Sequence, residues 1–358
     1  MSFRIGIVGA GGIGSLHAET AIKVGLEVGA VCDVDADRAR ALAARYPGAV
    51  ATTSIAELLK RSEIAAVVVA TPNVHHKKMA LAVIGAGKDL LLEKPMALSA
   101  VECDDIIGAI RETGALVQLG FVSRCAPASI AARELVTEGR FGRIYHAKAS
   151  QYRQRGIPGL GRWCTTRALS GGGVLMDLGV HLLDLVLWLT DFPTATRASS
   201  ICSSTFGSPI PRYRFSKMWA GPPNPDGVFD VEDAVTALVR FSGNMTMELN
   251  ATWAADIPAR WARNGVLLLG EKGGCYFDVW GNQLFVTTEQ GDPLDDQEQT
   301  LPTCDPWSVA WEEQYRRFLG MVTERSEPHA TAVQGRTVQR LVDALYRSAE
   351  EDREVEVV

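Results

Sequence analysis

Residues 5–14 read IGIVGAGGIG, an apolar run that passes directly into a cluster of glycines. The run predicts a buried β-strand, and the residues after Gly14 predict a helix. Gly9, Gly11 and Gly14 have the spacing G-x-G-x-x-G, which permits a tight turn and a close approach of backbone N–H groups to a pyrophosphate. A purely structural turn is the alternative. We predict a dinucleotide-binding loop formed by Gly9, Gly11, Gly12, Ile13 and Gly14.

An acidic residue closes the second predicted strand. Asp33 lies 24 positions after Gly9, where a carboxylate can accept hydrogen bonds from the adenosine ribose and repel a 2′-phosphate. Asp33 could instead cap the helix that follows. The first interpretation favours NAD over NADP as the cofactor.

The pattern of elements indicates two domains. The first 120 residues alternate β-branched apolar runs with helical patterns, which predicts an α/β fold with a doubly wound parallel sheet. Residues 197–288 consist mostly of short strands with glycine-containing turns, as in a mostly antiparallel sheet. We expect a dinucleotide-binding domain over 1–123 and an α+β domain over 124–358. Two closing helices could pack back on the first domain.

The composition is that of a soluble globular protein, with 47% hydrophobic and 22% charged residues. A net charge of −6 without a basic block makes nucleic acid an unsuitable partner. Seven cysteines without a C-x-x-C pair argue against disulfides or a zinc site and favour a cytoplasmic location. The most apolar segment, 174–189, contains two aspartates and a histidine, which argues against a membrane span. Residues 209–227 are rich in proline and glycine and predict a long excursion.

Two segments carry ionisable side chains in positions that suit chemistry. Glu93-Lys94-Pro95 follows a predicted strand, and ligands of open α/β sheets lie beyond the carboxyl ends of the strands. In the helix predicted over 174–189, Asp177, His181 and Asp184 share one face. A surface Glu–Lys pair, a satisfied buried polar cluster and an Asp177–His181 metal pair are alternatives. We expect no metal, because no further histidine or cysteine is spaced to complete its shell.

Together these motifs resemble those of the Gfo/Idh/MocA oxidoreductases, which include glucose–fructose oxidoreductase and myo-inositol dehydrogenase. The resemblance spans nearly the whole chain. It implies a Rossmann domain followed by a domain with a large open sheet, often buried in a homodimer or homotetramer. Further matching segments are His17, Thr71-Pro72-Asn73 with His76, Gly120-Phe121 with Arg124, Gly171-Gly172-Gly173, Glu232-Asp233, Gly270 with Gly273-Gly274, and Ala344-Leu345-Tyr346-Arg347-Ser348-Ala349.

The resemblance also implies roles for individual residues. The catalytic group would be Lys94, Asp177 and His181. The wall beside the nicotinamide ribose would be Thr71, Pro72, Asn73, His76, Glu93 and Lys94. Ser123 departs from the family's pattern, so the resemblance does not assign the substrate contacts at this position. Our candidates for substrate binding, besides Asp177 and His181, are Arg124, Arg153, Arg155, Trp163 and Arg167.

The activity implied is NAD-dependent oxidation of a secondary hydroxyl of a sugar or cyclitol. His181 would take the hydroxyl proton, since imidazole titrates near neutral pH. Lys94 would hydrogen-bond the developing alkoxide, and Asp177 would hold a substrate hydroxyl or orient the imidazole ring. Two alternatives share the fold: an NAD-dependent glycoside hydrolase that oxidises C3 transiently, and a regulator that senses NAD or sugar. The presence of all three catalytic residues argues against the regulator.

Overall fold

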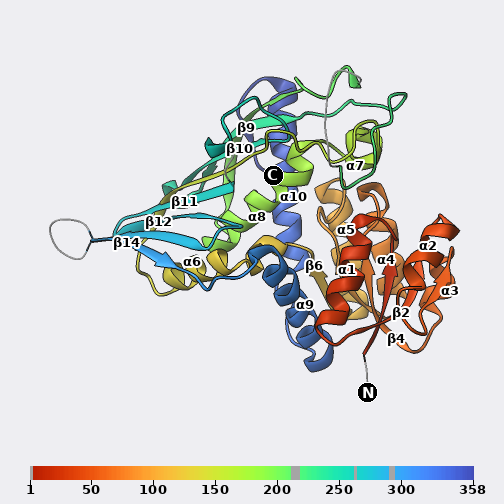
Figure 1. The fold of residues 1–358 in the computed structure, drawn as a ribbon. Coiled ribbons are helices and arrows are strands. Elements are labelled where there is room, and N and C mark those ends of the chain that lie inside the picture. Colours follow the sequence, from red (N-terminus) through yellow and green to blue (C-terminus); the bar gives the residue numbers. More distant parts are fainter. Residues whose placement is uncertain (1–2, 211–217, 262–263, 290–294) are drawn as a thin grey trace. The chain divides into compact units, whose positions relative to one another are not determined.

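The structure is a computed structural model that describes residues 3–210, 218–261, 264–289 and 295–358 (Figure 1). The chain divides into two compact units. The first comprises Met1–Gly120 and Trp311–Gln339, and the second comprises Phe121–Ala310 and Arg340–Val358. The division therefore falls after Gly120 rather than after residue 123. Helices α9 (Pro306–Glu324) and α10 (Ala332–Glu351) each contribute residues to both units.

The first unit is built on a six-stranded parallel sheet in the order β3-β2-β1-β4-β5-β6. The prediction of a doubly wound parallel sheet is confirmed. Strands β1, β4 and β5 are almost entirely apolar and buried, as parallel strands covered on both faces require. The strands are β1 (Arg4–Val8), β2 (Glu27–Cys32), β3 (Val50–Thr52), β4 (Ile64–Val69), β5 (Asp89–Leu92) and β6 (Val117–Leu119); the helices are α1 (Gly12–Lys23), α2 (Ala36–Ala43), α3 (Ile55–Leu59), α4 (His76–Gly85) and α5 (Ala100–Thr113).

The second unit contains a nine-stranded sheet in the order β14-β13-β12-β11-β7-β10-β9-β8-β15. Only the β7–β10 pair is parallel among its described strands, so the predicted, mostly antiparallel sheet is confirmed. Helices α6 and α8 pack on this sheet (Figure 1). The elements are α6 (Pro127–Thr137), β7 (Ile144–Tyr152), α7 (Arg167–Ser170), α8 (Val180–Leu189), β8 (Ala195–Ser203), β9 (Ala234–Phe241), β10 (Thr246–Thr252), β11 (Asn264–Gly270), β12 (Gly273–Asp278), β13 (Gln283–Thr288), β14 (Asp295–Thr300) and β15 (Val355–Glu356).

The apolar helix predicted over 174–189 is present, but it begins as a π-helical turn, Leu175–Gly179, that continues into α8. By length and composition alone, the helical stretch Arg167–Leu189 could cross a membrane. However, 83% of its most apolar window is buried inside the protein. The stretch therefore has the surroundings of a core helix in a soluble protein.

Arg124 and Asp184 form an enclosed ion pair, and this corrects the prediction that Arg124 contacts the substrate. The Nε atom donates to Asp184 Oδ2 at 2.8 Å and Nη2 donates to Oδ1 at 2.6 Å, with both side chains 0% exposed. The guanidinium also lies over the rings of Phe121 and Phe192. Burial raises the pKa of Asp184 despite the neighbouring cation. Asp184 thus serves this pair rather than extending the Asp177–His181 group.

Candidate active site

The glycine loop joins the carboxyl end of β1 to α1. A Cβ atom at Gly9 would lie 2.5 Å from the Ala70 carbonyl oxygen, and one at Gly14 would lie 1.8 Å from the Gly9 carbonyl oxygen. Gly11 and Gly12 are exposed, and no side chain caps the first turn of α1 at Gly11. Backbone N–H groups at a helix N-terminus without a side-chain cap suit an anion such as a pyrophosphate. The loop residues therefore fit a dinucleotide.

The Asp33 carboxylate connects this loop to the end of β2. Its Oδ2 accepts the backbone N–H of Ala10 at 2.7 Å, and its Oδ1 accepts that of Asp35 at 2.9 Å. The N-cap of α2 is Asp35, whose side chain accepts the N–H groups of Asp37 and Arg38. Asp33 is therefore not the helix cap, and its half-exposed carboxylate stands at the loop.

His76 links two segments that follow neighbouring strands. Thr71 comes after β4 and Pro95 comes after β5, and the carbonyl oxygens of these two residues lie 2.9 Å from His76 Nε2 and 2.6 Å from Nδ1. The side chain is buried, and burial lowers its pKa. Both ring nitrogens face main-chain carbonyl groups, and the role of His76 beside the nicotinamide ribose stays a prediction.

Glu93 is also buried, directly beside half-exposed Lys94. Its Oε1 lies 3.0 Å from His17 Nε2, and its Oε2 accepts the backbone N–H of Lys94 at 3.1 Å. His17 Nδ1 lies 2.8 Å from the hydroxyl of Tyr315 on α9. The Lys94–Pro95 peptide bond is cis. Lys94 therefore extends from a main-chain segment that a buried polar network holds.

Thr71, Pro72 and Asn73 follow β4 at the same sheet edge as Lys94. Thr71 and Pro72 are half-buried, whereas Asn73 is buried. Their role beside the nicotinamide stays a prediction.

Asp177 and His181 lie on consecutive helical turns of the second unit, and both are half-exposed. The indole Nε1 of Trp253, at the end of β10, donates to Asp177 Oδ2 at 2.9 Å. Sequence reasoning missed Trp253, because a single tryptophan after a strand has no distinctive spacing. The indole thus holds the Asp177 carboxylate, which lies four residues before His181.

The glycines before this helix admit two neighbours that the sequence did not reveal. A Cβ atom at Gly172 would lie 1.9 Å from the Tyr346 hydroxyl, and one at Gly173 would lie 1.9 Å from the Glu232 carbonyl oxygen. The Glu232 carboxylate accepts the N–H groups of Gly173 and Leu175 and the hydroxyl of Tyr346. Burial raises the pKa of Glu232.

The candidate substrate-binding residues between 153 and 167, here called the substrate loop, differ in their surroundings. Arg155 pairs with Asp256 and Arg167 pairs with Glu350, both at the surface. Trp163 packs edge-on against Trp219, with ring centroids 6.2 Å apart, and Trp219 is 44% exposed. Roles for Arg153, Arg155, Trp163 and Arg167 in substrate binding stay predictions.

Trp219 lies in the excursion predicted over 209–227, of which residues 211–217 lie outside the described residues. The described part is hydrogen-bonded to the substrate loop, from Ala220 to Pro158 and from Asn224 to Leu160. Sequence reasoning missed Trp219, and only this pairing of segments brings it to Trp163.

Two protein-family models match this chain. A model described as "Oxidoreductase family, NAD-binding Rossmann fold" matches residues 3–121, and a model of the "GFO/IDH/MocA C-terminal domain" matches residues 130–276. The chain belongs to the Gfo/Idh/MocA family. The resemblance inferred from the motifs is confirmed, and so is the NAD-binding domain.

Curated relatives of this Gfo/Idh/MocA protein include dehydrogenases. D-glucoside 3-dehydrogenase of Escherichia coli (strain K12) is 28% identical over 99% of this chain and 97% of its own. A putative UDP-kanosamine synthase oxidoreductase subunit of Amycolatopsis mediterranei (strain S699) is 30% identical over 71% of this chain and 70% of its own. The solved levoglucosan dehydrogenase, in complex with NADH and levoglucosan, has a TM-score of 0.86 over the full length of both chains. At 20% identity, this last likeness shows the fold alone.

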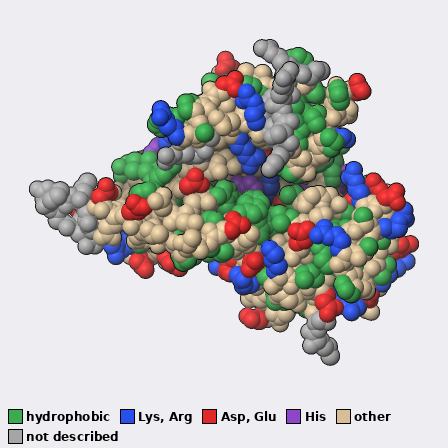
Figure 2. Space-filling view, in the orientation of Figure 1, with side chains coloured by type: hydrophobic (Ala, Val, Ile, Leu, Met, Phe, Trp, Pro, Cys, Tyr) green, Lys and Arg blue, Asp and Glu red, His purple; other side chains and the backbone are tan. Residues whose placement is uncertain are grey.

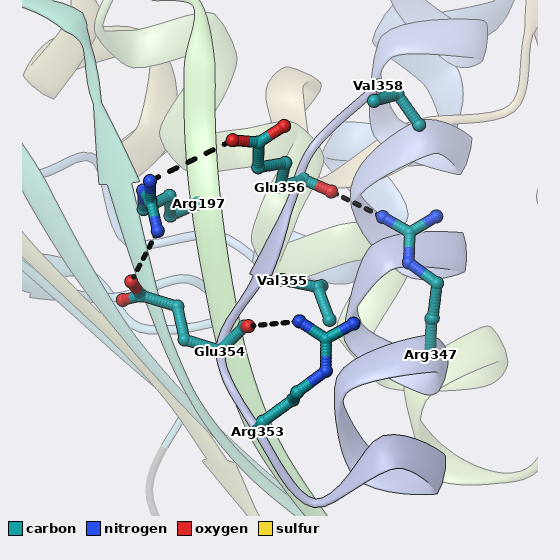
Figure 3. Close-up of a pocket in the computed structure, with 7 residues that line it drawn as sticks. All are labelled: Arg197, Arg347, Arg353, Glu354, Val355, Glu356 and Val358. Atoms are coloured by element: carbon teal, nitrogen blue, oxygen red, sulfur yellow. Dashed lines mark hydrogen bonds and ion pairs between the residues drawn. The ribbon is translucent and has the colours of Figure 1, made fainter.

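A surface pocket of about 370 Å³ in this family member lies beside β15 (Figure 3). Its arginines bond to the chain's own oxygens: Arg197 pairs with Glu354 and Glu356, and Arg347 donates to the Glu356 carbonyl. None of the predicted catalytic or cofactor residues lines it. The lining residues are Arg197, Arg347, Arg353, Glu354, Val355, Glu356 and Val358.

The position of Asp33 generates a test of cofactor selection. We expect Asp33→Ser to raise the ratio of kcat/KM for NADP to that for NAD by about tenfold, the effect of ~1.4 kcal/mol. The reason is that the variant removes the negative charge that would repel a 2′-phosphate. Asp35→Ser is the matched control, since serine also caps a helix and the ratio should not change. An unchanged ratio in Asp33→Ser would contradict the role given to this carboxylate.

Proposed function

We propose that this protein transfers hydride between NAD and a secondary hydroxyl of a sugar, sugar derivative or cyclitol. The observation that carries the proposal is the joint presence of half-exposed Lys94, Asp177 and His181, each on a segment held by buried neighbours. Relatives named D-glucoside 3-dehydrogenase and inositol 2-dehydrogenase support a polyhydroxylated substrate. Lys94 and the Asp177–His181 pair belong to different units, so their meeting around one substrate is part of the proposal.

Each residue has a chemical task in this proposal. NAD, when bound, would supply the acceptor for the hydride of the carbinol carbon. His181 accepts the hydroxyl proton, so that the alcohol loses one hydride and one proton and becomes a carbonyl. The Lys94 ammonium donates a hydrogen bond to the oxygen as negative charge develops on it. Asp177, held by Trp253, accepts a hydrogen bond from a neighbouring substrate hydroxyl.

The catalytic assignments predict a clear loss of turnover. Lys94→Ala and His181→Ala should each lower kcat by about 10²–10⁴-fold, the usual contribution of a positioned acid or base. NAD should still bind, because the glycine loop and Asp33 are unchanged; fluorescence titration measures this. The exposed His75 provides the control, and His75→Ala should keep wild-type turnover. Wild-type rates in either catalytic variant would rule out the assignment.

A substrate panel tests the proposal as a whole and separates it from transient C3 oxidation. Sugars, cyclitols and glycosides are supplied with NAD while NADH absorbance and product mass are followed in parallel. The proposed dehydrogenase accumulates NADH in step with a product two mass units lighter, the two hydrogens lost from the alcohol. Release of free aglycone without net NADH would instead identify a glycoside hydrolase. Binding of sugar without any turnover would favour a sensor.

We also propose that a second copy of the chain covers the open face of the large sheet. Across this face the strand register aligns one row of side chains: Leu238, Glu248, Lys148, Leu267, Tyr276 and Phe285. Leu238 and Phe285 are exposed, and Lys148 pairs with Glu248 in the middle of the row. Apolar side chains around a central ion pair can complement the same row in another copy.

Light scattering tests this association. Phe285→Asp places a carboxylate in the row and should reduce the particle mass to that of one chain. Val101→Asp, at an exposed apolar position on α5, is the control and should leave the mass unchanged. A wild-type mass of one chain would refute the proposal.

The remaining partner and location assignments follow from surface charge and cysteine chemistry. Acidic and basic side chains are interspersed over the visible face (Figure 2), which supports the absence of a nucleic-acid partner. The described structure contains no disulfide, and burial raises the pKa of Cys164, Cys202 and Cys275 to about 12. Thiols without disulfides suit the reducing cytoplasm, where we place the protein.

A further inference from the structure

We propose that Glu93 and Glu232 are positioning residues for the two halves of the active site. In each unit, one buried carboxylate holds the main chain of a catalytic segment, and a tyrosine from a C-terminal helix contributes to holding that carboxylate. The inference rests on the proposed function, because it takes Lys94 and Asp177 as the groups that are positioned. It also gives a function to the two C-terminal helices, because α9 carries Tyr315 and α10 carries Tyr346.

In the first unit, the carboxylate of Glu93 binds the main-chain amide of Lys94. A buried carboxylate is stable only where donors satisfy it, and Glu93 has one on each oxygen: His17 Nε2 at 3.0 Å and the Lys94 N–H at 3.1 Å. A Cβ atom at Gly120 would lie 2.7 Å from Glu93 Oε1, so the carboxylate is also confined sterically. The carboxylate therefore ties the first residue after Glu93 to the interior of the sheet.

His17 and Tyr315 extend this hydrogen-bonded network from Glu93 Oε1, with His17 in contact with Glu93 and Tyr315 in contact with His17. An ionised carboxylate can only accept, so His17 Nε2 carries the proton toward Glu93. His17 Nδ1 lies 2.8 Å from the Tyr315 hydroxyl, so the ring links this hydroxyl to the Glu93 carboxylate. Burial and the nearby Glu93 raise the pKa of Tyr315 well above its usual value, which keeps this hydroxyl protonated. His17 and Tyr315 are both 0% exposed, so water does not compete for these bonds.

A second buried carboxylate, in the other unit, also binds main-chain amides and a tyrosine hydroxyl. Glu232 accepts the N–H groups of Gly173 and Leu175 at 3.0 and 2.9 Å, and the hydroxyl of Tyr346 donates to it at 2.8 Å. The Asp177 N–H in turn donates to the Gly173 carbonyl at 3.0 Å. Glu232 thus satisfies the first free amides of the helical turn that carries Asp177.

We therefore expect that loss of either carboxylate, or of the tyrosine hydroxyl in its network, lowers turnover in addition to any loss of stability. Glu93→Gln keeps the shape of the side chain but replaces one accepting oxygen by an NH₂ group. The remaining oxygen cannot accept from both His17 Nε2 and the Lys94 N–H. Tyr315→Phe removes only the hydroxyl. We expect each to lower kcat about tenfold or more, because displacement of a catalytic group by ~1 Å is enough for such losses, while KM for the sugar stays within about threefold. In the second unit, Glu232→Gln and Tyr346→Phe should lower kcat/KM similarly.

The matched control is Tyr46→Phe, which removes another buried phenol hydroxyl of the first unit that has no hydrogen-bond partner in the structure. Its kcat should equal that of the wild type. Thermal melting identifies the folded variants, and the conservative Tyr→Phe pair keeps the test open where a Glu→Gln variant does not fold. Wild-type kcat in folded Glu93→Gln and Tyr315→Phe would overturn the role of Glu93. Wild-type kcat/KM in folded Glu232→Gln and Tyr346→Phe would overturn that of Glu232.

Hydrogen exchange separates this inference from the proposed function. In the wild type the amides of Lys94, Gly173 and Leu175 should be protected, and exchange should accelerate at Lys94 in Glu93→Gln and at Gly173 and Leu175 in Glu232→Gln. This readout needs no substrate, so it stands even where the panel of sugars gives no turnover and the proposed function fails. Unchanged exchange at these amides would show that the carboxylates do not hold the main chain.

Discussion

Parallel pairing of β1, β2, β4 and β5 is the constraint on which the first unit depends. Because parallel strands end at the same edge of a sheet, residues far apart in the sequence meet there. The glycine loop, Asp33, Thr71 and Lys94 each follow one of these strands. The Asp33 carboxylate accepts a main-chain N–H of the glycine loop, and the His76 ring lies between main-chain carbonyl oxygens of two neighbouring segments. The cofactor edge is therefore a set of connected loops on a rigid sheet.

Buried carboxylates are the second recurring device. Glu93, Glu232 and Asp184 are all buried, and each has its oxygens on donors from the chain itself. A carboxylate in an apolar interior is tolerated only with such partners. Glu93 and Glu232 contact the main chain next to proposed catalytic residues, whereas Asp184 contacts only the Arg124 guanidinium in the described hydrogen bonds. A buried carboxylate can therefore either hold the main chain beside a proposed catalytic residue or neutralise a buried cation, depending on the donors around it.

Predictions from the sequence succeeded where the information is local. Apolar runs of the first 120 residues gave the main parallel strands, and the glycine spacing located the turn after β1. Three strands were missed for a physical reason: β3 and β15 are too short to show a period, and β14 reads DDQEQT. All three lie at sheet edges, where one neighbour suffices and an apolar pattern is not required. Arg124 was misassigned because spacing alone does not reveal whether a cation has an internal partner.

The sequence by itself determined the family, the alternation of elements and the identity of the ionisable residues near the proposed chemistry, since each depends on residues close together in the chain. Only the tertiary structure decided that His76 faces the main chain, that Trp253 holds Asp177, and that Tyr315 and Tyr346 return to Glu93 and Glu232. These contacts join residues that are distant in the sequence. Their partners are selected by burial and by the need to satisfy every enclosed polar group, which no local pattern records.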